Sequence, residues 1–216
     1  MKVVSVNVGK PQEVEWKDTL VTTGIFKEPV QGPVMIRELN LDGDEQADLT
    51  VHGGAEKAVY GYASEHYEYW KQELPGVKFP WGKFGENLTT EGLFEDTLHI
   101  GDRLQVGSAV LTVTQPRLPC YKLTVRFNRD DMIKRFLAGR RSGFYFSVAE
   151  EGEVQTGSEI EILSRDPNRV RVADISQLYF SKDVDHELLE RAIKVRALPE
   201  SWRDELVARA QSRQRS

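Results

Sequence analysis

Cysteine is nearly absent from this chain of 216 residues, which contains only Cys120. A single cysteine excludes an internal disulfide, and a free thiol fits a reducing compartment. The four histidines are scattered along the chain. Together with one cysteine they do not give the paired spacing of a structural zinc site, so we do not expect zinc.

Long apolar runs and nucleotide-binding motifs are also lacking. No run approaches the roughly 20 residues of a membrane-spanning helix, and residues 1–8 alternate like a strand, unlike the apolar centre of a signal peptide. Neither a GxGxxG motif nor a P-loop occurs, which argues against a dinucleotide or ATP site. The net charge of -5 argues against nucleic-acid binding through bulk electrostatics. We therefore expect a cytoplasmic protein that binds neither membrane nor nucleic acid.

What is present, as far as residue 163, is mostly the period-two alternation of β-strands. Residues 4–8 alternate valine with polar side chains, and residues 14–23 resemble a hairpin that turns at Lys17-Asp18. Two helices are expected to interrupt the strands, one capped by Ser64 and one by Asp130 or Asp131. Further strands are expected near residues 34–39, 98–113, 144–148 and 154–163.

The period changes from 2 to 3.6 at residues 164–168. Three short amphipathic segments follow, and Asp174 and Asp185 are the expected caps of the first two. The sequence therefore predicts a mainly β domain with short helices over residues 1–165, and a small three-helix domain over residues 166–216.

The stretch Gln115–Leu123 is the most informative, because it carries Cys120 just after an apolar alternating run. Two prolines there withhold ladder hydrogen bonds, so the thiol is expected where a strand opens into a pocket. Arg117 and Lys122 are close in sequence, and cationic neighbours favour the thiolate, which is the nucleophilic and metal-binding form. A lone cysteine is also often a small buried hydrophobic residue, and the local sequence leaves both interpretations open.

The second informative stretch is the turn from His52 to Lys57, which contains two consecutive glycines. Glycines permit positive φ and can turn main-chain N–H groups toward an anion. The same residues can equally form an ordinary tight turn beside a structural histidine. Asn87, in a loop rich in glycine and aromatics, can likewise point into a pocket or hydrogen-bond its own turn.

Several cations occur in a protein that is acidic overall, which suits an anionic ligand with a soft centre for Cys120. These cations are Lys27, Arg37, Lys57, Arg117 and Arg141. A Cys–His hydrolase is an alternative, with His52, His66 or His99 as the base, although no local motif favours it.

Four segments, in the right order, resemble a MOSC domain, the C-terminal domain type of molybdenum cofactor sulfurases. They are Gly24–Val30, Asp44–Lys57, Gly85–Leu88 and Gln115–Leu123. The likeness is greatest to the YiiM-like branch, in which a MOSC domain is followed by a three-helix domain. The helical tail after Pro167 matches this branch independently.

The resemblance implies a β-barrel-like fold that binds the molybdenum cofactor, a pterin dithiolene with a phosphate, and it makes Cys120 the molybdenum ligand. The implied reaction reduces N-hydroxylated compounds, such as hydroxylamino purines, to the amine or amidine, and so detoxifies N-hydroxylated bases. The family as a whole is also associated with pyridoxal phosphate binding. The residues that the resemblance assigns to the cofactor are Lys27, Arg37, His52, Gly53, Gly54, Lys57, Asn87 and Arg117.

No iron–sulfur or haem attachment pattern is readable in the chain, so we expect electrons from a separate reductase, a flavoprotein. A non-catalytic carrier, which holds the cofactor or relays sulfur as a Cys120 persulfide, is the alternative function. A simple thiol or anion-binding module is the third. The helical tail is either a docking surface for the electron donor or a cover for one edge of the barrel.

Overall fold

The computed structural model describes residues 1–47, 53–181 and 183–214. One large sheet contains the strands β1 (Lys2–Val8), β4 (Glu28–Pro29), β6 (Val59–Ala63), β7 (Leu88–Glu91), β8 (Arg103–Val106), β9 (Ala109–Pro116), β10 (Phe144–Glu150) and β12 (Ile160–Ser164). Their order is β12-β8-β9-β10-β6-β7-β1-β4. The β6–β7 pair is parallel, whereas the other neighbours in the sheet are antiparallel.

The sheet curls back on itself, because β1 reaches the start of β12. Lys2 forms an isolated bridge with Glu159, and the N–H of Ile160 donates to the carbonyl of Met1 at 2.9 Å. Closure pairs strand edges that would otherwise be exposed. The prediction of a mainly β, barrel-like domain with short helices is therefore confirmed.

Two small ribbons flank the sheet. The hairpin of β2 (Gln12–Trp16) and β3 (Thr19–Thr23) turns at Lys17 and Asp18, which both have positive φ, as expected for this turn. The other ribbon pairs β5 (Val34–Ile36) with β11 (Gly152–Val154). The prediction of one strand over 154–163 is wrong, because the chain turns through Gly157 at φ 89° and pairs with two different partners on either side.

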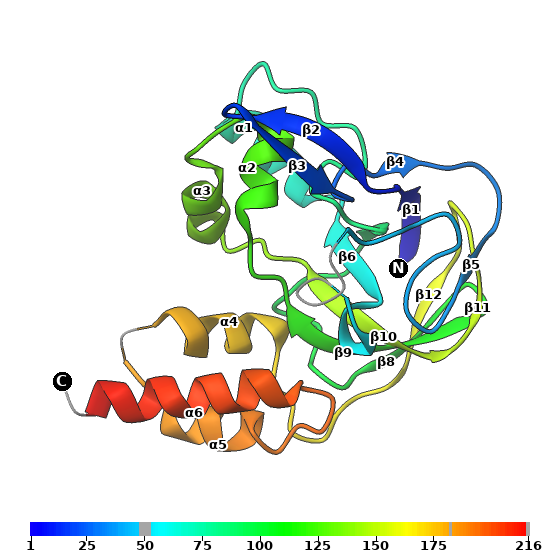
Figure 1. Cartoon of the computed structure of the whole chain (residues 1–216). Coiled ribbons are helices and arrows are strands. Elements are labelled where there is room, and N and C mark those ends of the chain that lie inside the picture. Colours follow the sequence, from blue (N-terminus) through cyan, green and yellow to red (C-terminus); the bar gives the residue numbers. More distant parts are fainter. Residues whose placement is uncertain (48–52, 182, 215–216) are drawn as a thin grey trace.

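The helices form two groups on the same side of the sheet, α1 to α3 at one end and α4 to α6 at the other (Figure 1). Their bounds are η1 (Ala55–Lys57, a 3₁₀ turn), α1 (His66–Glu73), α2 (Tyr121–Phe127), α3 (Met132–Gly139), α4 (Val172–Phe180), α5 (His186–Ala192) and α6 (Glu200–Gln214). In the described ranges, no helix combines the length and the apolar character needed to cross a membrane.

The predicted helix caps are only partly correct. Asp185 caps α5 as expected, by accepting a backbone N–H at 2.9 Å. Ser64 lies outside α1, and its hydroxyl donates to Glu65 at 3.2 Å and does not cap the helix. Asp174 is not the cap of α4 but its third residue, and its carboxylate reaches back to accept from the N–H of Arg171 at 2.8 Å, which is the reverse half of a capping box.

The helix after Asp130-Asp131 is present as α3, with Asp131 at its N-cap position. The Asp131 side chain makes no cap hydrogen bond. It instead pairs with Arg129 at 2.9 Å and with Arg135 at 2.7 Å.

One continuous apolar core joins the barrel to the C-terminal helices. It includes Leu104 and Leu111 from the barrel strands together with Ile175 and Leu206 from the bundle, all at most 2% exposed. Burial of such side chains is the main favourable contribution to folding. The three-helix unit therefore packs as part of the barrel's core and does not have a separate core of its own.

The C-terminal bundle is also hydrogen-bonded to the strand that leads to Cys120. Trp202 of α6 is 7% exposed, and its indole N–H donates to the side-chain oxygen of Gln115 in β9. The amide of Gln115 in turn donates to the carbonyl of Glu56 in η1 at 3.3 Å. The bundle therefore helps to fix two segments next to Cys120 and Lys57.

We expect Trp202→Phe to lower the free energy of unfolding by about 1–3 kcal/mol, because it leaves the buried Gln115 oxygen without its donor. Urea unfolding measures this change. The matched control is Trp16→Phe, at a half-buried position of the exposed β2–β3 hairpin, which should change stability by less than about 0.5 kcal/mol. Equal effects of the two substitutions would contradict the importance of this bond.

Candidate functional site

A cavity of about 90 Å³ lies just past the carboxyl end of β9. Segments distant in sequence form its walls, because strand ends from the barrel, η1 and the start of α2 meet there. The predicted site residues that line it are Lys27, Lys57, Asn87, Arg117 and Cys120. The tertiary structure thus brings together five of the residues that the sequence proposed separately.

Cys120 connects β9 to α2. The strand ends at Pro116 and the helix starts at Tyr121, so that Cys120 occupies the extended N-cap position, half-buried and facing the cavity. Its carbonyl accepts from the N–H of Leu123 at 2.9 Å. The expectation that the thiol lies where a strand opens into a pocket is confirmed, whereas the helix that begins directly after it had no clear sequence signal.

Arg117 is a cation buried beside the thiol, with only 7% of its surface exposed. Its guanidinium donates to the carbonyl of Phe84 and lies 4.7 Å from the ring centre of Tyr60. Burial by itself lowers the pKa of Arg117, but its interactions with Tyr60, Tyr145 and Cys120 outweigh burial and raise it. Arg117 therefore places a permanent positive charge near Cys120.

Lys27 is the second buried cation of the cavity, and Asp44 compensates its charge. The two side chains form a buried ion pair. Asp44 also accepts from the N–H of Gly9 and from the amide of Asn87, both at 2.9 Å. Burial lowers the pKa of Lys27, whereas Asp44 acts in the opposite direction. A buried charge such as that of Lys27 destabilises the folded protein unless an opposite charge compensates it.

Asn87 lines the cavity and at the same time holds its frame. Besides its bond to Asp44, its side-chain oxygen accepts from the N–H of Tyr60 at 3.1 Å. Of the two alternatives open from the sequence, the structure favours the amide that faces the pocket, because its partners lie far away in sequence and not in its own turn.

Lys57 lines the cavity from the end of η1. Gly54 has φ 103°, and its carbonyl accepts from the N–H of Lys57 at 3.0 Å. Glycine adopts this positive φ without steric cost, so the turn before Lys57 uses the conformational freedom expected of its glycines. Gly53 and Gly54 precede Lys57 but are not among the cavity-lining residues, and His52 lies outside the described residues.

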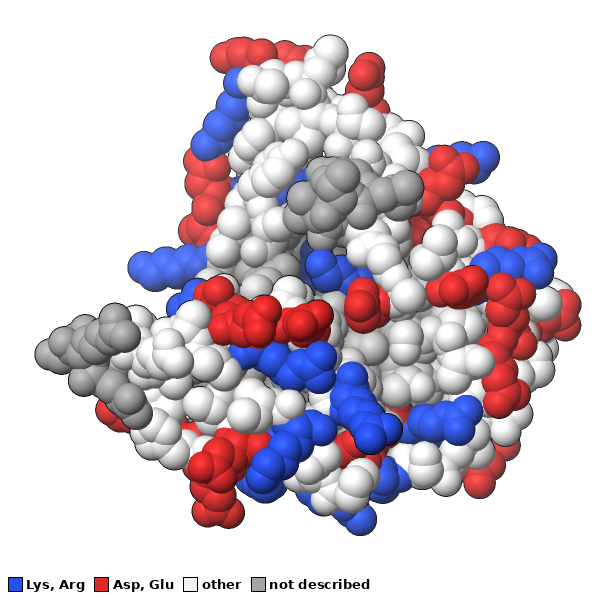
Figure 2. Space-filling view, turned by 60° about the horizontal axis from the view of Figure 1, so that its bottom comes forward, with Lys and Arg blue, Asp and Glu red and all other residues white. Residues whose placement is uncertain are grey.

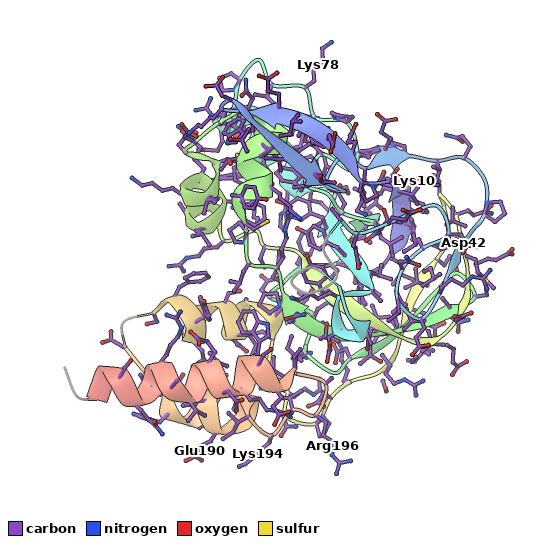
Figure 3. The ribbon with its side chains drawn as sticks, in the orientation of Figure 1. Lys10, Asp42, Lys78, Glu190, Lys194 and Arg196 are labelled. Atoms are coloured by element: carbon purple, nitrogen blue, oxygen red, sulfur yellow. The ribbon has the colours of Figure 1, made fainter. Side chains whose placement is uncertain are left out.

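Arg37 is a correction to the predicted site. It lies at the end of β5 with 47% of its side chain exposed, and it pairs with Asp42 at 3.0 Å and with Glu151 at 3.5 Å. Asp42 lies at the edge of the molecule and points outward (Figure 3). These ion pairs hold Arg37 on the outer surface, away from Cys120.

The histidines considered as bases for a hydrolase lie elsewhere. His66 pairs with Glu95 at 2.8 Å, and His99 contacts Asp102 at 3.2 Å. Neither lines the cavity of Cys120. A Cys–His pair involving His66 or His99 is therefore not formed.

Several cavity residues were not assigned to the site from the sequence, among them Asp44, Tyr60 and Tyr145. Lys122 was noted only as a cationic neighbour of Cys120 and not as a residue of the site. Asp44 and Lys122 are charged residues that are only 3% and 8% exposed. Both lie within the segments that carry the family resemblance, which is the signal that could have identified them. Tyr60 and Tyr145 pair across β6 and β10, and only this pairing brings them together.

Figure 2 shows Lys and Arg side chains in the middle and lower part of one outer face, with Asp and Glu side chains among them. The positive charge of the cavity is separate from this surface and local, because Lys27, Arg117 and Lys122 are at most 8% exposed in a chain with a net charge of -5. A local field of this kind attracts small anions while the protein remains acidic overall.

The fold and the cavity together define a class of protein in which a half-buried thiol at a barrel strand end faces a cation-lined pocket. The model of the MOSC domain matches residues 48–161, and that of the YiiM-like, 3-alpha helix domain matches residues 172–213. The chain belongs to the MOSC-domain family, in its YiiM-like branch.

Similar proteins extend over nearly the whole chain. YflK of Bacillus subtilis (strain 168) is 40% identical over 201 residues, which span 93% of this chain and 90% of YflK. The crystal structure of YiiM from Geobacillus stearothermophilus is 34% identical, with a TM-score of 0.80 over 96% of this chain and 98% of that one. A protein of Gibberella moniliformis (strain M3125 / FGSC 7600) named "Reductase" is 33% identical over 172 residues, 78% of this chain but only 30% of that protein.

We expect Asp44→Asn to lower the free energy of unfolding by roughly 3–5 kcal/mol, since it leaves the buried Lys27 without a counter-charge. The double variant Lys27→Met/Asp44→Asn should recover most of this loss, because no uncompensated charge remains. Urea unfolding of the wild type, both single variants and the double variant gives the coupling energy. A double variant as unstable as Asp44→Asn alone would contradict this account.

The Asp44→Asn defect should also depend on pH. Because the folded-state pKa of Lys27 lies below its unfolded value, the destabilisation is fully present below the folded pKa and is lost as the pH rises towards the usual lysine value of about 10.4. Unfolding curves measured at neutral and at alkaline pH, normalised to the wild type at each pH, test this direction.

Proposed function

We propose that this protein reduces N-hydroxylated compounds, such as hydroxylamino purines, to the corresponding amines, with the molybdenum cofactor bound at Cys120 and electrons from a separate flavoprotein reductase. One observation carries the proposal. The half-buried thiol shares its cavity with four cationic side chains, Lys27, Lys57, Arg117 and Lys122, in a chain of the MOSC family.

The cavity residues fit the chemistry of this cofactor. Its phosphate is an anion, and Lys57 and Arg117 offer an ammonium and a permanent guanidinium charge at the same cavity. Cys120 supplies one thiolate, the type of ligand that soft metals prefer. Tyr60 and Tyr145 contribute aromatic surface for a pterin ring. We assign the phosphate to Lys57 and Arg117, and molybdenum to Cys120.

When bound, the cofactor would supply two-electron oxygen-atom chemistry. The overall reaction consumes one N-hydroxy compound, two electrons and two protons, and it yields one amine and one water. The N–O bond breaks, the substrate nitrogen is reduced and the reductase is oxidised. The chain itself would bind and orient the reactants, and its cationic side chains would stabilise negative charge near the departing oxygen.

We expect Cys120→Ala to lower the turnover of a hydroxylamino purine by at least about 100-fold, because even outer-shell changes at metal sites cost 10–100-fold. The assay uses protein purified anaerobically from a host that makes the cofactor, with molybdenum and pterin measured in the same samples. Leu20→Ala, in the exposed hairpin, is the control. Full activity of Cys120→Ala would contradict the assigned ligand.

The same experiment separates enzyme from carrier. Stoichiometric molybdenum and pterin without reduction of any N-hydroxylated compound would favour the non-catalytic carrier, with Cys120 as ligand or persulfide. Wild-type protein without molybdenum or pterin would overturn both functions and leave Cys120 as a simple thiol.

A separate electron donor is supported by the relative named "Reductase", in which the part similar to this chain is less than a third of the protein. We expect the cofactor-loaded chain to show no turnover with NADH alone, and turnover with a chemically reduced viologen dye. Oxidation of NADH coupled to amine formation by the purified chain would contradict the need for a separate reductase.

A further inference from the structure

A second, larger hollow lies between the two helix groups. It has a volume of about 700 Å³ and is walled by α3 and the turn after it on one side and by α4 on the other. We call it the interhelix groove. The roles proposed for the Cys120 cavity make no use of this second space.

Two different helices contribute exposed apolar side chains to the groove. Leu137 of α3 is 36% exposed and Phe180 of α4 is 49% exposed, and both line the groove. The Phe180 ring is supported from behind by Tyr179, edge to face, with ring centres 4.8 Å apart. An exposed aromatic ring that packs on a second ring, in a groove that also has an aliphatic side chain, is suited to holding a flat ring.

Polar groups lie beside the apolar walls. Gln177 is an exposed residue of α4, one turn before Phe180, and it lines the groove together with Ser176 and Ser181. A glutamine amide both donates and accepts, which matches the paired donor and acceptor on the edge of an aminopurine. The combination of ring, aliphatic wall and amide is therefore complementary to a nucleobase.

The opposite wall is held in a fixed position. Glu95 accepts from the N–H of Gly143 at 2.7 Å and from His66 at 2.8 Å. Arg141 donates to the carbonyl of Gly139 at 2.6 Å and stacks 3.8 Å from the ring centre of Tyr69. The turn after α3 is thus preorganised, which lowers the cost of binding.

The groove and the Cys120 cavity share a wall. Arg117 lines both spaces. Tyr60, which lines the cavity, donates from its hydroxyl to the carbonyl of Ser142, which lines the groove, at 2.8 Å. A molecule held in the groove therefore lies directly behind the residues that face the thiol.

We propose that the interhelix groove is the substrate-recognition site, in which Phe180 stacks on the heteroaromatic ring of an N-hydroxylated base and Gln177 pairs with its edge, while the N–OH group faces Arg117, the side chain that also lines the Cys120 cavity. This inference rests on the proposed function and assigns to the C-terminal helices a role in choosing the substrate. Phe180 and Gln177 are the specificity-determining residues.

Binding of adenine tests the groove without requiring catalysis, because adenine is a reaction product and has no oxygen to lose. We expect calorimetric titration of the full chain to show saturable adenine binding, weakened about tenfold or more by Phe180→Ala, since one stacked base contributes about 1–3 kcal/mol. Gln177→Ala should weaken it about fivefold or more. Phe180→Trp keeps a ring and should retain the affinity. The matched control is Ile193→Ala, which removes an apolar side chain with 36% exposure from the same bundle, outside the groove.

Kinetics on the cofactor-loaded enzyme complete the test. Phe180→Ala should raise KM for 6-hydroxylaminopurine about tenfold while kcat and molybdenum content stay within about twofold, because the substituted side chain acts mainly in binding. Reduction with unchanged KM and unchanged adenine affinity in Phe180→Ala would overturn the groove but leave the proposed function intact. Absence of adenine binding to the wild type would also overturn it. Adenine binding that depends on Phe180, without any reduction, would support the groove and refute the proposed function.

Discussion

Burying cations beside a thiol is the constraint on which the cavity depends, because an ammonium or guanidinium taken out of water is strongly destabilised unless charge and hydrogen bonds compensate it. Asp44 provides the charge for Lys27. Arg117 has a tyrosine ring and the carbonyl of Phe84. That carbonyl is presented by a loop whose N–H groups at Gly82 and Phe84 donate to the buried carboxylate of Glu86 at 3.0 and 3.1 Å. Asp44 and Glu86 are therefore buried in the barrel because one compensates Lys27 and the other holds the loop that binds Arg117.

The C-terminal helices also support the Cys120 cavity. They share the barrel's apolar core, and Trp202 is hydrogen-bonded to Gln115, two residues before Arg117. Gln115 is bonded in turn to the backbone of the turn that ends at Lys57. Movement of the bundle against the barrel would therefore disturb both sides of the Cys120 cavity. The bundle also forms one wall of the interhelix groove. A unit that the sequence presents as an appendage therefore lines the groove and, through Trp202, supports the Cys120 cavity.

Under the proposed function, the chain would separate two tasks in space. The cavity gathers positive charge around a thiol, which suits an anionic cofactor, whereas the groove offers a ring, an aliphatic wall and an amide, which suit an aromatic substrate. Arg117 lies between them. Such a division allows the helices of the groove to change with the substrate while the barrel keeps the cofactor frame unchanged.

The sequence by itself determined the features that depend on local periodicity and local backbone preferences. Alternation predicted barrel strands such as β1, β9 and β10, although not β4, β6 or β7. The turn at Lys17-Asp18 identified the hairpin, and Asp185 marked the start of α5. The motif around Cys120 indicated a thiol at a strand end. The tertiary structure decided the rest, since it depends on contacts between residues far apart in the chain. Only folding shows that Arg37 is held on the surface by Glu151, that Lys27 is paired with Asp44 in the interior, and that α3 and α4 enclose a groove. The sequence alone does not show whether the side chain of a lysine or arginine is exposed to water or buried in the core. Packing decides this, and it also decides which opposite charge lies beside the side chain.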